Sequence, residues 1–333
     1  MNYIPKHNEI LLLTYAGSIA CGLDTDSSDV DLMGIAIPPA HVREGLTFSW
    51  DQLEDKAFFP QFLKLGTINT LHKTQAKANG LEGNIYNLKK YMLLAAKCNP
   101  TILIPMFCDQ QHVILENHNG NRLRHNRDEF LSLMAYKSFT GYALTQLKRI
   151  RGHKKWLDNP PSRPDRKALG LPTDHKLLNK EQLKSLITLS AQQMMDLGIS
   201  QKLVELILAE QKYMRDMQTW KQFETWRENR NPTRAALEAK GGYDTKHAMH
   251  LVRLMTMGEE IVKYQTVNVN REGIDNKFLL DIRNGLWDYD QLIEWAEKKQ
   301  KEIDEFVDSG KCTLPKEPNW NALEVLYTDL INS

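Results

Sequence analysis

The sequence predicts an α+β protein in which a region with strands and helices precedes a long helical region. Two short apolar runs, residues 10–16 and 30–37, have the length and composition of buried strands. From about residue 120 onward apolar residues recur at helical spacing, and no strand-like alternation of useful length occurs. We therefore expect two domains, residues 1–120 and residues 121–333.

The order of elements follows from the residues that interrupt them. The first strand ends at Gly17-Ser18, and the second stops at Pro38-Pro39. The polar stretch between them, residues 24–29, reads as a loop. A third strand ends at residues 85–87 and leads into a helix that stops before Asn99-Pro100. The later helices are expected at residues 128–157, 180–196, 200–228, 247–264 and 289–306.

Composition excludes several classes of protein. The 333 residues are 41% hydrophobic and 26% charged, which is ordinary for a globular chain. The net charge of +1 means that any surface for nucleic acid must be a local patch. The four cysteines form no C-x-x-C pair, which argues against a zinc ribbon. No segment has the apolar length of a membrane span or signal peptide, so we expect a cytoplasmic protein without a membrane partner.

Asp29 and Asp31 are the most informative residues, because they lie two apart at the start of a strand. Such residues point to the same face of a sheet, whereas Val30 and Leu32 point into the core. Two neighbouring carboxylates repel each other unless cations lie between them. A pair of Mg²⁺ ions, or Mn²⁺ in their place, would satisfy this requirement and suits phosphoryl transfer.

The Gly17-Ser18 pair follows a strand and is expected to open a helix. Glycine allows the backbone to approach a phosphate closely, and Ser18 supplies a hydroxyl and an N–H. Ser28, beside Asp29, is a further candidate for nucleotide contact. A D-x-D pair alone is more often a solvated surface strand, and a G-S pair alone is only a turn. Their combination, with Gly22 and Gly34, is far more specific.

This pattern resembles the signature of the DNA polymerase β-type nucleotidyltransferase superfamily. It is most similar to a bacterial and phage family of predicted nucleotidyltransferases that gene context links to RNA repair. The closer resemblance covers nearly the whole chain, least at about residues 175–225. It rests on the segments at residues 86–91, 98–101, 139–143, 146–150, 153–157, 159–161 and 242–254. The resemblance implies a small mixed β-sheet core with a catalytic role for residues 1–120. The helical residues 121–333 would complete the cleft and the acceptor surface.

The superfamily uses a third carboxylate from a neighbouring strand, and the resemblance implies Glu82 for this role. A strand at residues 82–86 would place Glu82, Asn84 and Tyr86 on one face. An ordinary surface role for Glu82 is an open alternative, and the rival acids are Asp51, Glu54 and Asp55. One departure is clear: family members commonly carry a Glu shortly after the Asn-Pro pair, where this chain has Ile104-Pro105.

Two cationic helix faces are candidates for phosphate contact. Lys148, Arg151 and Lys155 share one face, with Trp156 nearby for base stacking. Lys246, His250 and Arg253 share another, and the resemblance favours the cleft for it. The alternative for both faces is ordinary exposure to solvent, aided in the first case by the helix dipole.

The expected activity is transfer of a nucleoside monophosphate from an NTP to a hydroxyl, with release of pyrophosphate. Asp29, Asp31 and Glu82 would bind the metals, and Ser18 would hold the β- and γ-phosphates. The expected acceptor is an RNA 3′ end, such as that of a tRNA. A protein hydroxyl, modified by AMPylation, is the alternative within enzymes. A catalytically silent RNA-binding protein with the same fold is the alternative outside them.

Overall fold

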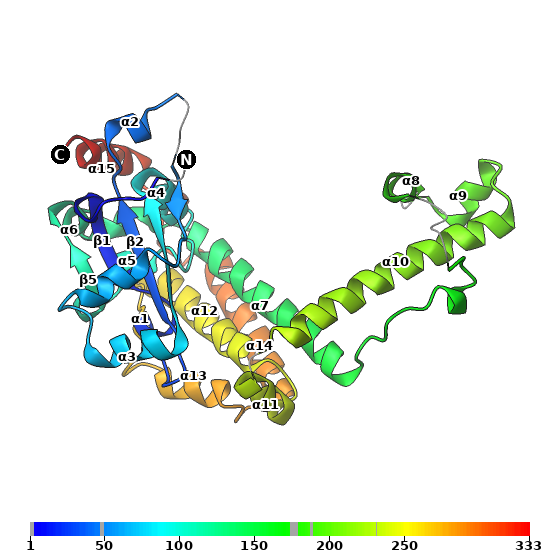
Figure 1. Ribbon diagram of the computed structural model, residues 1–333. Coiled ribbons are helices and arrows are strands. Elements are labelled where there is room, and N and C mark those ends of the chain that lie inside the picture. Colours follow the sequence, from blue (N-terminus) through cyan, green and yellow to red (C-terminus); the bar gives the residue numbers. More distant parts are fainter. Residues whose placement is uncertain (1–2, 47–49, 174–178, 187–188, 231) are drawn as a thin grey trace. The chain divides into compact units, whose positions relative to one another are not determined.

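The computed structural model describes residues 3–46, 50–173, 179–186, 189–230 and 232–333 (Figure 1). The chain forms two compact units. The first comprises residues 1–150 and 245–333, and the second comprises residues 151–244. The chain leaves the first unit after Ile150 and returns to it at Thr245. Separate roles for residues 1–120 and 121–333 stay a prediction.

The first unit contains a five-stranded mixed sheet in the order β3-β4-β2-β1-β5. The strands are β1 (Ile10–Tyr15), β2 (Val30–Ala36), β3 (Gln52–Leu53), β4 (Leu81–Asn87) and β5 (Val113–Glu116). β2 runs antiparallel to β1 and parallel to β4. All six residues of β1 are buried, as its continuous apolar run predicts. The expected α+β class and mixed sheet are confirmed.

Helices cover this sheet and continue into a bundle (Figure 1). The earlier helices of the unit are α1 (Gly17–Ala20), α2 (Ala40–Arg43), α3 (Thr70–Asn79), α4 (Leu88–Ala96), α5 (Ile104–Phe107) and α6 (His118–His125), followed by α7 (Met134–Asp158), which runs on into the second unit. The later ones are α12 (Thr245–Tyr264), α13 (Asn276–Arg283), α14 (Tyr289–Asp308) and α15 (Trp320–Asn332). Short 3₁₀ turns occur at His7–Glu9, Phe59–Lys64, Gln110–His112 and Arg127–Phe130.

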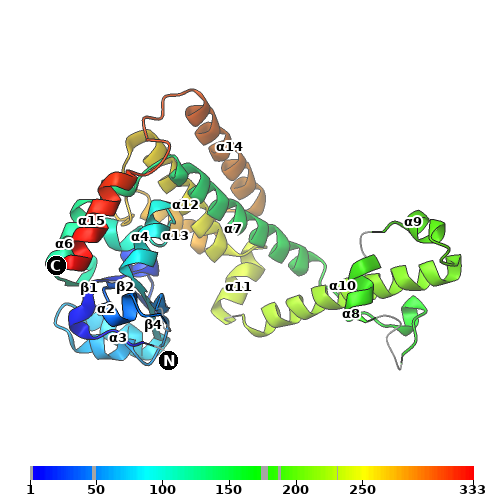
Figure 2. The same ribbon diagram turned by 90° about the horizontal axis from the view of Figure 1, so that it is seen from above.

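Helices α7, α12 and α14 lie side by side in the first unit (Figures 1 and 2). Gly258 of α12 faces Phe139 of α7 so closely that a Cβ there would lie 3.1 Å from the Phe139 Cβ. Phe139 is 1% exposed, so it is a core residue. Lys299 of α14 pairs with Glu259 of α12 at 2.9 Å. Close packing and partly buried ion pairs therefore hold α12 in place.

The second unit is helical. Its helices are the end of α7, α8 (Lys180–Leu186), α9 (Ala191–Asp196), α10 (Gln201–Glu228) and α11 (Pro232–Gly241), with a 3₁₀ turn at Lys167–Leu169. Arg166 binds Glu210 through two hydrogen bonds of 2.7 and 2.8 Å, and the Glu210 side chain is 1% exposed. The single helix expected at residues 180–196 is wrong: α8 and α9 are separate, with Ser190 capping α9.

Arg271 connects the helices of the first unit to the loop after α1. Its guanidinium is fully buried and forms ion pairs with Glu260 and Asp275 at 2.8 and 2.7 Å. Its backbone N–H donates to the Cys21 carbonyl at 3.0 Å. The helical residues thus hold a loop that lies beside the start of β2.

We expect Arg271→Met to lower the free energy of unfolding by about 3 kcal/mol, because it leaves two partly buried carboxylates without their cation. Urea unfolding followed by tryptophan fluorescence measures this loss. Arg122→Met is the control, since Arg122 pairs with Asp329 on the surface, at 31% and 54% exposure. Its loss should stay below about 1 kcal/mol. Equal losses in the two variants would contradict the importance of the buried pair.

Candidate active site

Asp29, Asp31 and Glu82 converge at the start of two neighbouring strands. The register of the parallel pair β2 and β4 places Asp31 directly opposite Glu82. Asp29 lies just before β2, two residues from Asp31. One carboxylate oxygen from each of the three side chains lies within 4.8 Å of those of the other two. The structure therefore brings together the three acids that the sequence analysis expected to act jointly.

The surroundings of Asp31 disfavour its negative charge. Burial, followed by the charges of Asp29 and Glu82, raises the pKa of Asp31 from 3.8 to about 6. Lys246, on α12, opposes this shift. The Glu82 carboxylate forms an ion pair with Lys56 at 3.0 Å, but the Lys56 side chain is 74% exposed and can move away at little cost. The cluster thus carries more negative charge than its protein neighbours neutralise.

The donor set fits a divalent cation. Carboxylate oxygens are the ligands that Mg²⁺ and Mn²⁺ prefer, and three carboxylates converge here from two adjacent strands. The raised pKa of Asp31 indicates that a cation between the carboxylates would stabilise their ionised form. These acidic groups could therefore hold a metal.

The turn at Gly17-Ser18 lies against Asp31. Gly17 has a φ of +56°, and a Cβ on it would lie 2.1 Å from Asp31 Oδ2. The Ala16 N–H donates to the Asp31 carbonyl at 2.8 Å, which fixes the turn next to the acid. Only glycine fits this combination of left-handed backbone and close approach. The expected helix is a single turn, Gly17–Ala20, so its dipole is weaker than that of a long helix.

The loop that follows this turn is held by residues from the far end of the sequence. Arg283 Nη1 donates to the Leu23 carbonyl at 2.6 Å, and Arg253 Nη1 contacts Cys21 Sγ. Gly22 packs against Asn270 and Glu272. The sequence analysis missed this group, because no local pattern connects residues 250 positions apart. The placement of the Gly17-Ser18 turn therefore depends on α12, α13 and the chain between them.

Lys246 and His250 lie on α12 in the first unit. Lys246 is exposed, and its charge acts on Asp31. Burial lowers the pKa of His250 well below its usual range, and the charges of Arg253, Lys246, His247 and Arg283 lower it further. His250 is thus neutral at pH 7 and offers hydrogen bonds rather than charge. The cations of this face come from its lysine and arginine residues.

Other predicted contacts lie elsewhere. Ser28 is 4% exposed, and its Oγ accepts a hydrogen bond from the Thr25 N–H at 2.9 Å, so its hydroxyl stabilises the loop before Asp29. Lys148 is exposed on α7 in the first unit, whereas Arg151 on the same helix belongs to the second. Their contact with nucleotide stays a prediction.

The rival acids for the third carboxylate have other partners. Asp51 pairs with Lys90 at 3.7 Å, Glu54 accepts from Asn84 Nδ2 at 3.0 Å, and Asp55 accepts from the Ala57 N–H at 2.9 Å. None of them joins the group formed by Asp29, Asp31 and Glu82. Ile104 and Pro105, the position at which the family resemblance led us to expect an acid, are buried in α5, a setting that does not suit a charge.

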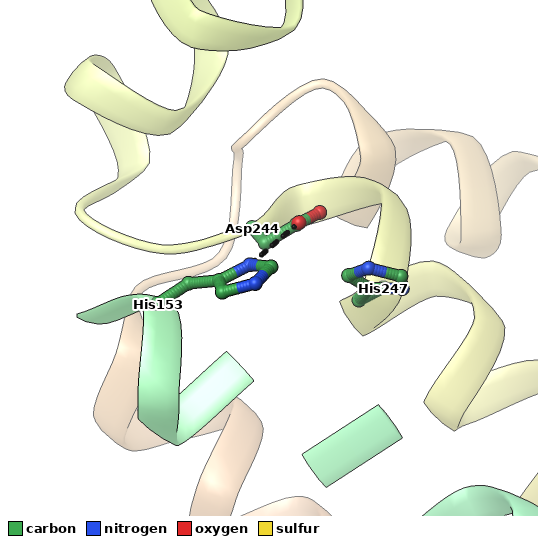
Figure 3. A group of neighbouring side chains, drawn as sticks. All are labelled: His153, Asp244 and His247. Carbon is green, nitrogen blue, oxygen red and sulfur yellow. Dashed lines mark hydrogen bonds and ion pairs between the residues drawn. The ribbon is translucent and has the colours of Figure 1, made fainter. Parts of the chain in front are cut away.

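Trp156 is packed within the second unit. Its ring stacks on His153 at 5.7 Å between centroids and contacts Phe223 and Trp226. His153 Nδ1 lies 3.1 Å from Asp244 Oδ2, and the Asp244 side chain is 1% exposed (Figure 3). The ring expected to stack on a base is therefore engaged in an aromatic cluster of the protein itself.

Comparison with known proteins supports the class that this site defines. Residues 4–159 match the model of RlaP, described as the RNA repair pathway DNA polymerase beta family. This match confirms the expected superfamily for the part of the chain that carries Asp29, Asp31 and Glu82, and it implies a DNA polymerase β-type nucleotidyltransferase of RNA repair. No curated protein and no solved structure matches the chain significantly. No helix in the described part of the chain has the length and apolarity to cross a membrane.

Proposed function

We propose that this protein transfers a nucleoside monophosphate from an NTP to a hydroxyl of an RNA 3′ end, such as that of a tRNA, and releases pyrophosphate. The observation that carries this proposal is the convergence of Asp29, Asp31 and Glu82 beside the Gly17-Ser18 turn. Two bound divalent cations would make the acceptor hydroxyl more acidic and would neutralise the negative charge of the leaving pyrophosphate.

Each residue has a part that follows from its position. The three carboxylates would hold the cations: Asp31 lies against the turn, Asp29 precedes Asp31 by two residues, and Glu82 lies opposite Asp31 on the neighbouring strand. Gly17 lets a phosphate approach the backbone, and Ser18, which is partly exposed, offers its hydroxyl to the β- and γ-phosphates. Lys246 adds positive charge near Asp31. The RNA acceptor is supported by the description of the matching family.

Incubation with each NTP labelled at the α-phosphate, with Mg²⁺ or Mn²⁺, and with total tRNA or lysate protein tests the proposal. We expect label in RNA and a matching release of pyrophosphate. Label in protein would show AMPylation instead. Binding of RNA without transfer of label from any NTP would show a silent RNA-binding protein and would contradict the proposal.

A further inference from the structure

A pocket of about 770 Å³ lies in the first unit. Its wall combines the chain before α5 with parts of α7 and α12. Three permanent cations line it, Lys137, Arg149 and Arg253, together with His247 and His250. None of the described residues that line it is an Asp or a Glu. Positive charge with no carboxylate among these lining residues favours an anionic ligand.

Tyr142 gives this pocket a surface for a base. It is 41% exposed, and its hydroxyl accepts a hydrogen bond from Asn99 Nδ2 at 2.7 Å, which fixes the ring. Sites that bind single-stranded nucleic acid usually combine cationic side chains, which contact the phosphates, with an accessible aromatic ring on which a base stacks.

One face of β4 connects the pocket to the site. Glu82, Asn84 and Tyr86 share this face, since they are two residues apart along the strand. Asn84 Nδ2 donates to the Tyr86 hydroxyl at 3.1 Å, and Tyr142 is close enough to raise the pKa of Tyr86, after burial and Glu54. Four residues of strand span about 13 Å. This polar strip therefore leads from Glu82 to the pocket over the length of a few nucleotides.

Helix α12 forms the second connection. Lys246 acts on Asp31, whereas His250 and Arg253 line the pocket. Residues at spacings of four and three lie on one helical face, so these three side chains form a continuous row. One face of β4 and one face of α12 therefore lead from the carboxylates toward the pocket.

The order of strands indicates which substrate the pocket serves. Gly17 follows β1, Asp31 lies on β2 and Glu82 lies on β4, in the order β4-β2-β1. The strip therefore starts on the opposite side of Asp31 from the turn assigned to the triphosphate. Building on the proposed function, we propose that this pocket binds the phosphates and a base of the acceptor RNA, a few nucleotides before its 3′ hydroxyl.

Arg149 and Lys148 provide a matched test, because they are adjacent, exposed cations on α7 and only Arg149 lines the pocket. The probe is a fluorescein-labelled single-stranded RNA of about 12 nucleotides with a free 3′ hydroxyl. Fluorescence anisotropy without NTP measures its affinity. We expect Arg149→Ala to weaken binding about tenfold and to reduce the salt dependence by about one phosphate contact. Lys148→Ala should lose clearly less affinity than Arg149→Ala.

A second pair of variants tests the ring. Tyr142→Phe should bind the RNA as the wild type does, whereas Tyr142→Ala should lose about tenfold, because stacking needs the ring and not the hydroxyl. Equal losses in Arg149→Ala and Lys148→Ala would overturn the pocket in favour of the basic face that contains Lys148. Weaker binding of NTP alone, with unchanged RNA affinity in Arg149→Ala, would also overturn it.

Failure of the proposed catalytic function and failure of the proposed pocket give different results. If the wild type binds RNA through Arg149 but transfers no label from any NTP, the pocket stands and the catalytic proposal fails. If label is transferred and Arg149→Ala binds the RNA as tightly as the wild type, the pocket fails and the catalytic proposal stands. Circular dichroism of each variant checks that the substitutions leave the fold intact.

Discussion

Asp31→Asn is expected to lower nucleotidyl transfer at least about 10³-fold and, in the absence of metal, to make the protein more stable at pH 7. The loss of activity follows because Asp31 is the central member of the carboxylate group, opposite Glu82 and two residues from Asp29. The gain in stability follows because burial and two neighbouring acids disfavour the Asp31 charge. The variant removes that charge and keeps the shape of the side chain.

The pH dependence of this gain has a definite sign. The pKa of Asp31 is about 6 in the folded protein, compared with 3.8 for an ordinary aspartate in the unfolded chain. The folded state therefore binds the proton more tightly. The Asp31 charge therefore destabilises the wild type above about pH 6, and this cost disappears as the pH falls to about 4. At pH 7 in EDTA we expect Asp31→Asn to gain up to about 3 kcal/mol.

Thermal and urea unfolding at several pH values measure the gain. Asp26→Asn is the control, since Asp26 is an exposed acid in the same loop before β2. It should change neither activity nor stability appreciably. If the wild type is more stable than Asp31→Asn at pH 7 with all metal chelated, the surroundings of Asp31 do not disfavour its ionised form.

Gly17→Ala is expected to reduce activity about 10²-fold or more. The new Cβ would meet Asp31 Oδ2 at 2.1 Å, so the carboxylate must move from its place beside Glu82 and Asp29. A displacement of this size near reacting groups is costly. The left-handed φ of +56° adds backbone strain.

Gly170→Ala separates these two effects. Gly170 has a similar φ of +69°, and a Cβ on it would meet nothing within 4 Å. It should therefore lose some stability through strain and keep its activity. Steady-state kinetics of both variants, with unfolding curves beside them, provide the comparison. Equal activity in Gly17→Ala and the wild type would show that the Gly17-Ser18 turn is not part of the active site.

Local patterns predicted the strands of the candidate site well. The alternation Asp29-Val30-Asp31-Leu32 indicated a strand with acids on one face, and β2 has that arrangement around Asp31. The run after Asn84 indicated only the end of a strand, whereas β4 extends back to Leu81. The position of Glu82 came from the family resemblance, and the parallel pairing that sets it opposite Asp31 is a long-range contact.

Long-range contacts explain what the sequence could not show. The charge run at residues 148–155 directed attention to Lys148 and Arg151, but the face of α7 that lines the pocket carries Lys137 and Arg149. Which face of a long helix meets α12 depends on tertiary packing, such as Phe139 against Gly258. The helix expected to begin at Gly17 is a single turn, because Gly22 and the loop around it are held by Arg271 and its neighbours.

Direct binding of Mn²⁺ tests the central claim, that Asp29, Asp31 and Glu82 form one metal site serving an NTP. Electron paramagnetic resonance can count bound Mn²⁺ in the presence of an NTP analogue that is not hydrolysed between its α- and β-phosphates. We expect two bound Mn²⁺ ions for each wild-type chain. Asp31→Asn should bind Mn²⁺ with much lower affinity, whereas Asp26→Asn should bind it as the wild type does. Unchanged Mn²⁺ binding in Asp31→Asn would contradict it.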